Sequence, residues 1–83
     1  MKVRYFAWVR ERVGVSEEEI DPPAEVASVA ELMAYLARRD PGYAAAFAEP
    51  HIIRAALDRQ HVEHTAPLAG AREVAFFPPM TGG

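Results

Sequence analysis

The segment Ser28-Val29-Ala30-Glu31-Leu32-Met33-Ala34-Tyr35-Leu36-Ala37-Arg38-Arg39 carries the clearest helical pattern in this 83-residue chain. Ser28 stands three residues before Glu31, which is the spacing of a capping box at a helix start. The apolar residues that follow fall at helical intervals and form one stripe: Val29, Leu32, Met33 and Leu36. Asp40-Pro41-Gly42 then breaks the pattern. We expect one amphipathic helix that needs a partner surface for one face.

Segments typical of β-strands lie on both sides of this helix. They are Lys2–Val9 and Glu17–Ile20 before it, and Ile52–Leu57, His61–His64 and Glu73–Phe77 after it. Short helical turns are expected at Trp8–Val13 and around Tyr43–Phe47, and a turn at Asp58-Arg59-Gln60. Alternation in the last strand places Val74 and Phe76 on one face. The first and last strands are apolar at nearly every position, as expected of central strands.

The order of these elements predicts an α+β fold, with a mixed sheet packed on one main helix. A β-grasp, ubiquitin-like sheet fits this order best. A ferredoxin-like sandwich requires a second full helix before the last strand, and Pro67–Arg72 is too short to supply one. We expect one domain over residues 1–77 and an extended C-terminal tail over residues 78–83.

Composition excludes several classes of function. The chain is 51% hydrophobic and 25% charged, as in ordinary globular domains. It contains no cysteine, which excludes disulfides, thiolate metal sites and thiol nucleophiles. The net charge of −3 provides no field that attracts nucleic acid or an anionic membrane. No signal peptide or membrane span is recognisable, so we expect a cytoplasmic protein with neither nucleic acid nor membrane as a partner.

Side-chain constellations for catalysis or metal binding are weak. His61 and His64 are three apart in a predicted strand and point to opposite faces, while His51 is expected in a loop. Glu17-Glu18-Glu19 reads as a solvated acidic edge, which protects an edge strand from aggregation. No nucleophile triad or phosphate-binding loop is present. The sequence therefore predicts no metal site and no enzyme acting on its own.

The tail carries the most specific signal. It reads Pro78, Pro79, Met80, Thr81, Gly82 and Gly83. Two prolines favour an extended chain that stands away from the body of the domain. Residues without a Cβ allow close backbone approach, so Gly82 and Gly83 fit a narrow channel in a partner enzyme. A free carboxylate is a poor electrophile that must be activated before a nucleophile attacks it, and we predict the Gly83 carboxylate as the functional group.

The segment Val74–Gly83 resembles the C-terminus of the MoaD family, the small subunits of molybdopterin synthase. Val3–Ala7 and Ser28–Leu32 resemble that family's first strand and helix start. The resemblance implies that a MoeB-like adenylyltransferase uses ATP and Mg²⁺ to adenylate Gly83. Sulfur from a cysteine desulfurase or sulfurtransferase system then replaces AMP and leaves a thiocarboxylate.

The same resemblance implies a second partner, a MoaE-like large synthase subunit in a heterotetramer of two small and two large subunits. The tail residues that thread into partner sites are then Pro78, Pro79, Met80, Thr81 and Gly82. Gly83 gives its sulfur to cyclic pyranopterin monophosphate, and the catalytic side chains belong to the large subunit. No cofactor is expected to stay bound to this chain.

Strand alternation and the resemblance together predict a docking surface. Phe6 shares a predicted strand face with Lys2 and Arg4, and Phe77 shares one with Glu73. Aromatic side chains on a charged face are typical of partner patches. The alternative is that Phe6 or Phe77 packs beneath a loop. Two further residues match interface positions of the family and complete the predicted surface, Arg10 and His61.

Three other functions remain open from the sequence. A sulfur carrier for thiamin or for tRNA thiolation shares the Gly-Gly end, although such carriers usually lack Phe-Phe-Pro-Pro before it. A ubiquitin-like modifier attached through Gly83 to lysines of other proteins would use the same activated terminus. A structural binding module with an inert tail would need no activation.

Overall fold

The computed structural model describes residues 1–79 and contains five strands, three α-helices and one 3₁₀ helix. The strands are β1 (Lys2–Tyr5), β2 (Glu17–Glu19), β3 (Arg54–Leu57), β4 (Gln60–Val62) and β5 (Glu73–Phe77). The helices are α1 (Ala7–Val13), α2 (Val29–Ala37), α3 (Pro41–Ala46) and the 3₁₀ turn η1 (Pro50–Ile52). The expected main helix, both short helices and all five strands are present within these residues.

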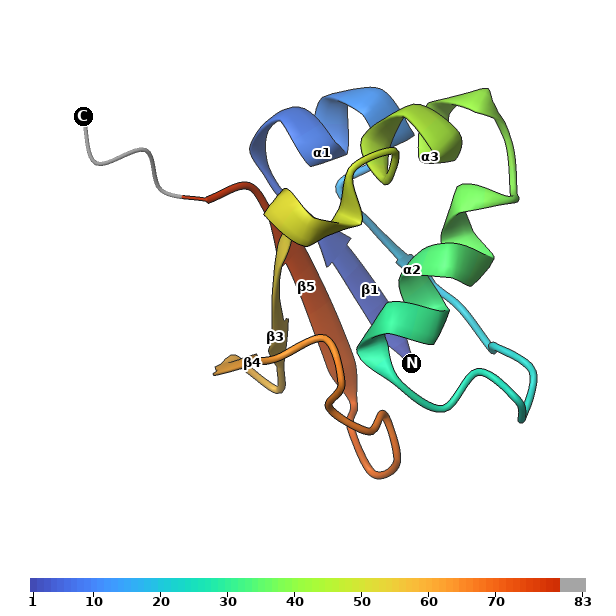
Figure 1. Cartoon of the computed structure of the whole chain (residues 1–83), viewed down its shortest axis with the longest axis vertical. Helices are drawn as coiled ribbons and strands as arrows, with labels where there is room; N and C mark the ends of the chain where they lie inside the picture. Colours follow the sequence, from blue (N-terminus) through green and yellow to red (C-terminus); the bar gives the residue numbers. More distant parts are fainter. Residues whose placement is uncertain (80–83) are drawn as a thin grey trace.

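The strands form one mixed sheet in the order β2-β1-β5-β3-β4 (Figure 1). β5 lies at the centre, parallel to β1 and antiparallel to β3. β2 and β4 are the antiparallel edge strands. This arrangement is the mixed, β-grasp sheet that the element order predicts, and the C-terminal strand is its central one.

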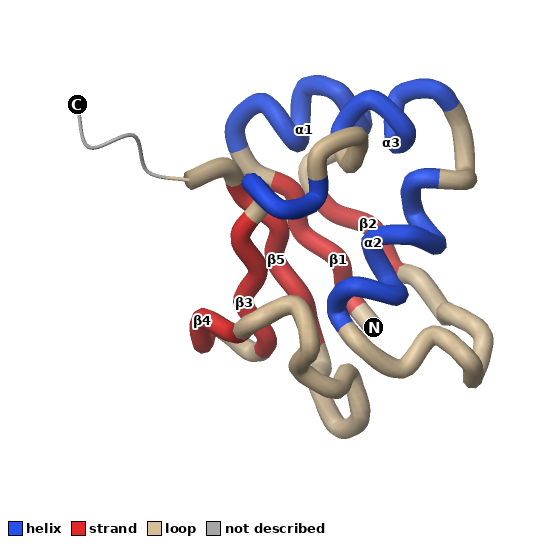
Figure 2. The backbone as a smooth tube through the Cα atoms, viewed as in Figure 1, coloured by secondary structure: helices blue, strands red, loops and turns tan. Residues whose placement is uncertain are grey.

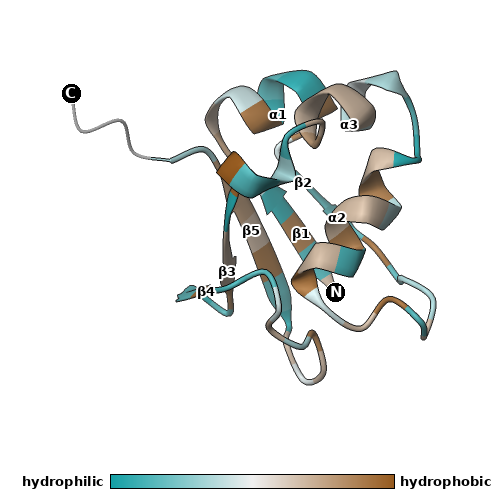
Figure 3. Cartoon of the chain, viewed as in Figure 1, coloured by the Kyte–Doolittle hydropathy of each residue, from teal (hydrophilic) through white to brown (hydrophobic). Residues whose placement is uncertain are grey.

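All three α-helices lie on one side of the sheet or above its end, as Figure 2 shows. The core between these layers contains fully buried residues from β1, β5 and α2, among them Val3, Val74, Phe76, Leu32 and Leu36. Hydrophobic residues are interspersed with hydrophilic ones along β1 (Figure 3). The sheet therefore has an inner face in the core and an outer face that no described helix covers.

The start of α2 resembles the expected capping box, except that Glu31 bonds the amide of Ala27 instead of that of the N-cap residue Ser28. The Ser28 hydroxyl accepts a hydrogen bond from the Glu31 amide at 3.2 Å, and Glu31 Oε1 accepts one from the Ala27 amide at 3.0 Å. These contacts satisfy amides that have no partner inside the helix. No helix described in residues 1–79 is long and apolar enough to cross a membrane.

The first strand is shorter than its apolar pattern predicts. It ends at Tyr5 rather than Val9 because the chain turns into α1 at Ala7, whose φ is +53°. A residue with a side chain adopts this left-handed region at an energetic cost. Two backbone hydrogen bonds of Phe6 stabilise the corner. Its amide donates to the Phe76 carbonyl, and its carbonyl accepts from the Val9 amide.

The predicted bounds of the hairpin formed by β3 and β4 are also wrong. Pro50–Ile52 forms a 3₁₀ turn, so β3 begins at Arg54 rather than Ile52, and His51 lies in this turn rather than in a loop. Asp58 and Arg59 make the hairpin turn with φ values of 47° and 70°. Positive φ at both central residues matches the twist of the strands. β4 therefore already starts at Gln60.

Candidate docking face and tail root

The outer face of the sheet brings together side chains from four neighbouring strands. The register pairs Arg4 with Ala75, Ala75 with Ala56, and Ala56 with His61. Because side chains alternate across a strand, the neighbours of these residues on the same face are Lys2, Glu73, Phe77 and Arg54. The small alanines leave the middle of the face shallow, with aromatic and charged side chains around it.

Phe6 lies at the end of this face, next to the start of α1. Its side chain is 39% exposed, which makes it one of the few large hydrophobic residues left open to solvent. The Arg4 guanidinium lies 5.3 Å from the centre of the Phe6 ring, within the range of a cation–π contact. Arg4 also lies 3.7 Å from the Glu73 carboxylate. Phe6 is thus placed beside Arg4, as predicted, although it belongs to a corner and not to the strand.

Phe77 and His61 form an aromatic pair on this face. Their ring centres are 5.4 Å apart, and Arg54 is the register partner of Phe77 on β3. Phe77 is half-buried, so it does not disappear beneath a loop. Arg10, the remaining predicted interface residue, is exposed on α1. Within residues 1–79, the predicted docking residues lie towards the end of the sheet where β5 leaves it.

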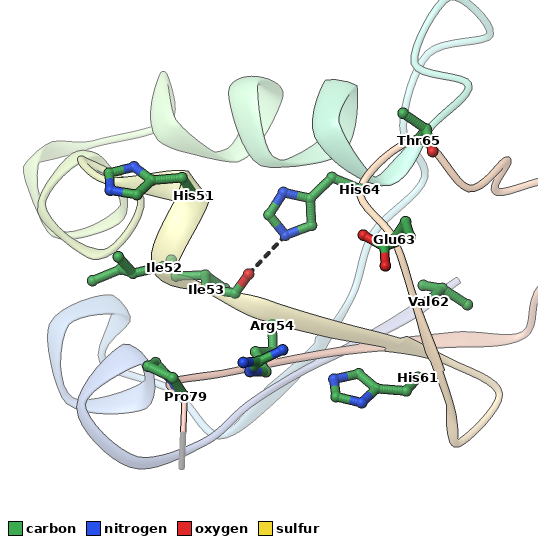
Figure 4. A pocket seen from close by; sticks show the side chains of 10 residues that line it. All are labelled: His51, Ile52, Ile53, Arg54, His61, Val62, Glu63, His64, Thr65 and Pro79. Carbon is green, nitrogen blue, oxygen red and sulfur yellow. Dashed lines mark hydrogen bonds between the residues drawn. The ribbon is translucent and has the colours of Figure 1, made fainter. Parts of the chain in front are cut away.

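A groove of about 790 Å³ runs beside this end of the sheet (Figure 4). It is lined by the η1 turn, the start of β3, the segment from β4 to Thr65, and Pro79. Arg54 and His61 lie on one side of β3, whereas His51 and His64 lie on the other. His64 Nε2 donates to the Ile53 carbonyl at 2.7 Å. The sequence did not indicate the groove, because its walls are far apart along the chain.

The histidines of the groove have separate environments. His64 follows β4 instead of belonging to it, and its ring is held by a backbone carbonyl, whereas the His61 ring lies tilted against the Phe77 ring. Among residues 1–79, no three or more histidine, aspartate or glutamate side chains are arranged to hold a metal ion. The groove next to Pro79 is lined by both polar and apolar side chains.

The tail leaves directly from the central strand. β5 ends at Phe77, and the half-buried Pro78 and Pro79 follow without a turn. Neither proline has an amide proton to donate to a neighbouring strand, so the sheet cannot extend through them. The predicted site residues beyond this point lie outside the described residues: Met80, Thr81, Gly82 and Gly83.

A polar cluster on the inner side joins the sheet to the helical layer. The Glu18 carboxylate accepts hydrogen bonds from Tyr43 Oη at 2.6 Å, Tyr5 Oη at 2.8 Å and Arg39 at 3.1 Å. Burial opposes ionisation of Glu18, but these three donors outweigh it and lower its pKa. Burial and the Glu18 contact raise the pKa of Tyr43 to about 12 and raise that of Tyr5 further.

This cluster corrects the interpretation of Glu17-Glu18-Glu19 as a uniformly solvated edge. Glu17 and Glu19 face outward and pair with Lys2 and the N-terminal amine, whereas Glu18 points inward. The reason is strand alternation, since the register places Glu18 opposite the buried Val3. A carboxylate with three donors stabilises the fold, and none of its partners lies on the outer face.

Comparison with known proteins covers the whole chain, including the residues after Pro79. A model of the "ThiS family" matches residues 3–83. The chain is 37% identical over 83 residues to the molybdopterin synthase sulfur carrier subunit of Escherichia coli (strain K12), covering 100% of this chain and 99% of the relative.

Solved structures show the same fold. A Pyrococcus furiosus protein, provisionally described as molybdopterin converting factor, subunit 1, has a TM-score of 0.73 and 31% identity over 95% of both chains. SAMP1 from Haloferax volcanii has a TM-score of 0.72 at 22% identity, covering 100% of this chain and 98% of that one. The likeness to SAMP1 concerns the fold alone. The likeness to the Pyrococcus furiosus protein, together with the family match and the full-length relative, shows that the chain belongs to the MoaD/ThiS family.

Proposed function

We propose that this chain is the sulfur-carrier subunit of a molybdopterin synthase. The observation that carries the proposal is the full-length identity of 37% to a carrier of that name, which includes the tail region. The Phe76-Phe77-Pro78-Pro79 sequence before the glycines also favours this function over thiamin or tRNA thiolation carriers. The chain itself supplies a carboxylate and a docking face, and the catalytic side chains belong to its partners.

In the proposed cycle, the carboxyl group of Gly83 is activated and then carries the sulfur atom as a thiocarboxylate. A MoeB-like adenylyltransferase, with its own ATP and Mg²⁺, forms the mixed anhydride of the Gly83 carboxylate with AMP. A persulfide from a cysteine desulfurase or sulfurtransferase system displaces AMP and forms an acyl disulfide, which a thiol then reduces to the Gly83 thiocarboxylate while a disulfide forms on the sulfur-delivery side. In the synthase, that sulfur passes to cyclic pyranopterin monophosphate. The root of the tail on the central strand supports this role, because a rigid strand fixes where the tail begins.

The outer face is the proposed contact for a MoaE-like large subunit. Four residues at its tail end are the proposed interface: Phe6, Arg10, His61 and Phe77. Burying half-exposed aromatic rings is favourable, and aromatic and arginine side chains dominate the binding energy of many interfaces. Phe6 is already held by Arg4, so less side-chain entropy is lost when a partner covers it. The alanines at the centre of the face allow close approach.

The test is intact mass spectrometry of the protein purified from its native cells. We expect a species in which one oxygen at Gly83 is replaced by sulfur, located by sequencing the C-terminal fragment. A thiol-selective reagent must label it, because an oxidised methionine has nearly the same mass. A plain Gly83 carboxylate after incubation with ATP, a sulfur source and the adenylating partner would contradict the proposal, and lysine-linked adducts would support the modifier function instead.

A further inference from the structure

We propose that the near absence of lysine protects this carrier from acylation by its own activated terminus, and that Lys2 is the one side-chain acceptor that remains. Of the nine lysine and arginine residues, only Lys2 is a lysine. Lysine is among the commonest residues in globular domains, so this bias is marked. The inference rests on the proposed function in one respect, the activation of Gly83.

Arginine and lysine differ in their reactivity toward activated acyl groups. A guanidinium stays protonated at any physiological pH and is not a nucleophile, whereas the small neutral fraction of a lysine amine is a nucleophile that forms amides with activated acyl groups. Both side chains supply the positive charge that a docking face uses. Replacing lysine with arginine therefore keeps the charge and removes the reactivity.

The arginines of the outer face lie where a lysine would be most exposed to the tail. Arg54 is the register partner of Phe77, and it lines the same groove as Pro79. Arg4 pairs with Ala75, two residues before the end of β5. Four residues follow Pro79, and four residues span at most about 14 Å when fully extended. A primary amine at position 54 would thus lie within reach of Gly83 of the same molecule.

Lys2 lies at the opposite end of the sheet. It pairs with Glu73, which lies six positions before Pro79, and six steps correspond to about 20 Å of extended strand. Its side chain is 47% exposed, and Nζ lies 3.5 Å from the Glu17 carboxylate. The terminus of the same molecule can approach Lys2 only at full stretch. A second copy can reach it freely once the ion pair opens.

The reaction at issue is a simple aminolysis. The lone pair of a neutral lysine Nζ attacks the carbonyl carbon of Gly83, a C–N bond forms, and the C–O bond to AMP breaks. AMP leaves as an anion, and the proton from nitrogen passes to solvent. The amide is stable, so a carrier consumed in this way cannot accept sulfur. Arginine at positions 4 and 54 prevents that loss.

The experiment uses the full chain with Gly83 prepared as a 2-mercaptoethanesulfonate thioester by intein cleavage. Aminolysis then releases a thiolate instead of AMP, and no adenylating enzyme is needed. Three variants are compared with the natural chain: Arg54→Lys, Arg72→Lys and Lys2→Arg. Arg72 is exposed and precedes β5 at the end of the sheet near Lys2, so Arg72→Lys adds an amine far from the tail root.

We expect the natural chain to hydrolyse, with a minor amide product between two copies that maps to Lys2 and disappears in Lys2→Arg. Arg54→Lys is expected to form an amide within one molecule at least ~10-fold faster, at a rate independent of protein concentration. Arg72→Lys should form an amide within one molecule no faster than the natural chain does, because its amine lies far from the tail root. Equal rates for Arg54→Lys and Arg72→Lys would overturn the protective role of arginine. An amide at another amine, or none at Lys2 in concentrated protein, would overturn the assignment of Lys2.

This outcome is separate from that of the proposed function. The thioester supplies the activated terminus chemically, so the reactivity of the surface is measured whether or not Gly83 is adenylated in cells. Mass spectrometry of the native protein decides the adenylation and sulfur loading independently.

Discussion

The two faces of the sheet consist of the same strands but differ in how they are stabilised. On the inner face, Val3, Tyr5, Val74 and Phe76 are 0–1% exposed and lie under the helices. On the outer face, Phe77 is half-buried, and the charged neighbours form ion pairs at 3.5–3.9 Å. Exposed ion pairs contribute little to stability, so the inner face holds the fold together. The outer face leaves Phe6 exposed and Phe77 half-exposed to solvent.

The largest expected effect is on the inner face. Phe76 is fully buried, and its ring lies 5.2 Å from Phe47 and 6.5 Å from Tyr5. Phe76→Ala leaves a cavity among rigid neighbours and should lower the free energy of unfolding by about 3–5 kcal/mol. Urea unfolding followed by circular dichroism measures this. A loss below ~1 kcal/mol would mean that the inner face is not the main source of stability.

The adjacent position on the outer face should behave in the opposite way. Phe77→Ala removes a half-buried ring that contacts His61, so we expect a loss of stability of no more than ~1 kcal/mol. Affinity for the large subunit should fall by ~30-fold or more, as for an aromatic residue central to an interface. Isothermal titration calorimetry with the separately purified large subunit gives this value. Unchanged affinity together with a large stability loss would remove the functional difference between the faces.

Two neighbouring glutamates give a matched comparison of smaller size. Glu18→Gln weakens the inner cluster with Tyr5, Tyr43 and Arg39 and should cost about 1–3 kcal/mol at neutral pH. Glu17→Gln, which affects only half-exposed ion pairs, should cost below ~1 kcal/mol. Urea unfolding of the two variants side by side measures the difference. Equal losses would show that the inward position of Glu18 has no energetic consequence.

The contacts of Glu18 also predict that the stability of the fold depends on pH. The pKa of Glu18 is lowered in the folded state from its ordinary value of 4.5, so the folded protein binds fewer protons there than the unfolded chain. The stability it contributes is present above the ordinary carboxyl pKa and is lost as the pH falls through the lower, folded one. Glu18→Gln should flatten this acid limb of the stability curve, which urea unfolding at a series of pH values measures.

The smallest and most local expected effect is a change in the alkaline ionisation of Tyr43. Burial and then the contacts with Glu18 raise the pKa of Tyr43 to about 12, so the part of its stabilising effect that depends on Glu18 is present below the ordinary tyrosine pKa and is lost as the pH rises through the folded value. Glu18→Gln should move the ionisation of Tyr43 to lower pH. Ultraviolet absorbance of tyrosinate follows this shift, and an unchanged titration would show that Glu18 does not control Tyr43.

Much of the fold was predictable because its signals are local. Ser28 and Glu31 form their capping box within one turn, and β5 spans Glu73–Phe77 as the alternation predicts. Bounds failed where a distant contact intervened. The apolar pattern runs past Tyr5, but the bond from the Phe6 amide to the Phe76 carbonyl fixes a corner at Ala7 that no neighbouring residue indicates.

The sequence by itself determined the class of sheet, the main helix, the buried side of the central strand and the family-like tail, since each depends on periodicity or on residues adjacent in the chain. Only the tertiary structure decided that Glu18 turns inward to three donors from β1, α3 and the end of α2. It also decided that Arg54, His61 and Pro79 share one groove. These groupings depend on strand register and layer packing, which join residues far apart in the chain and leave no local pattern.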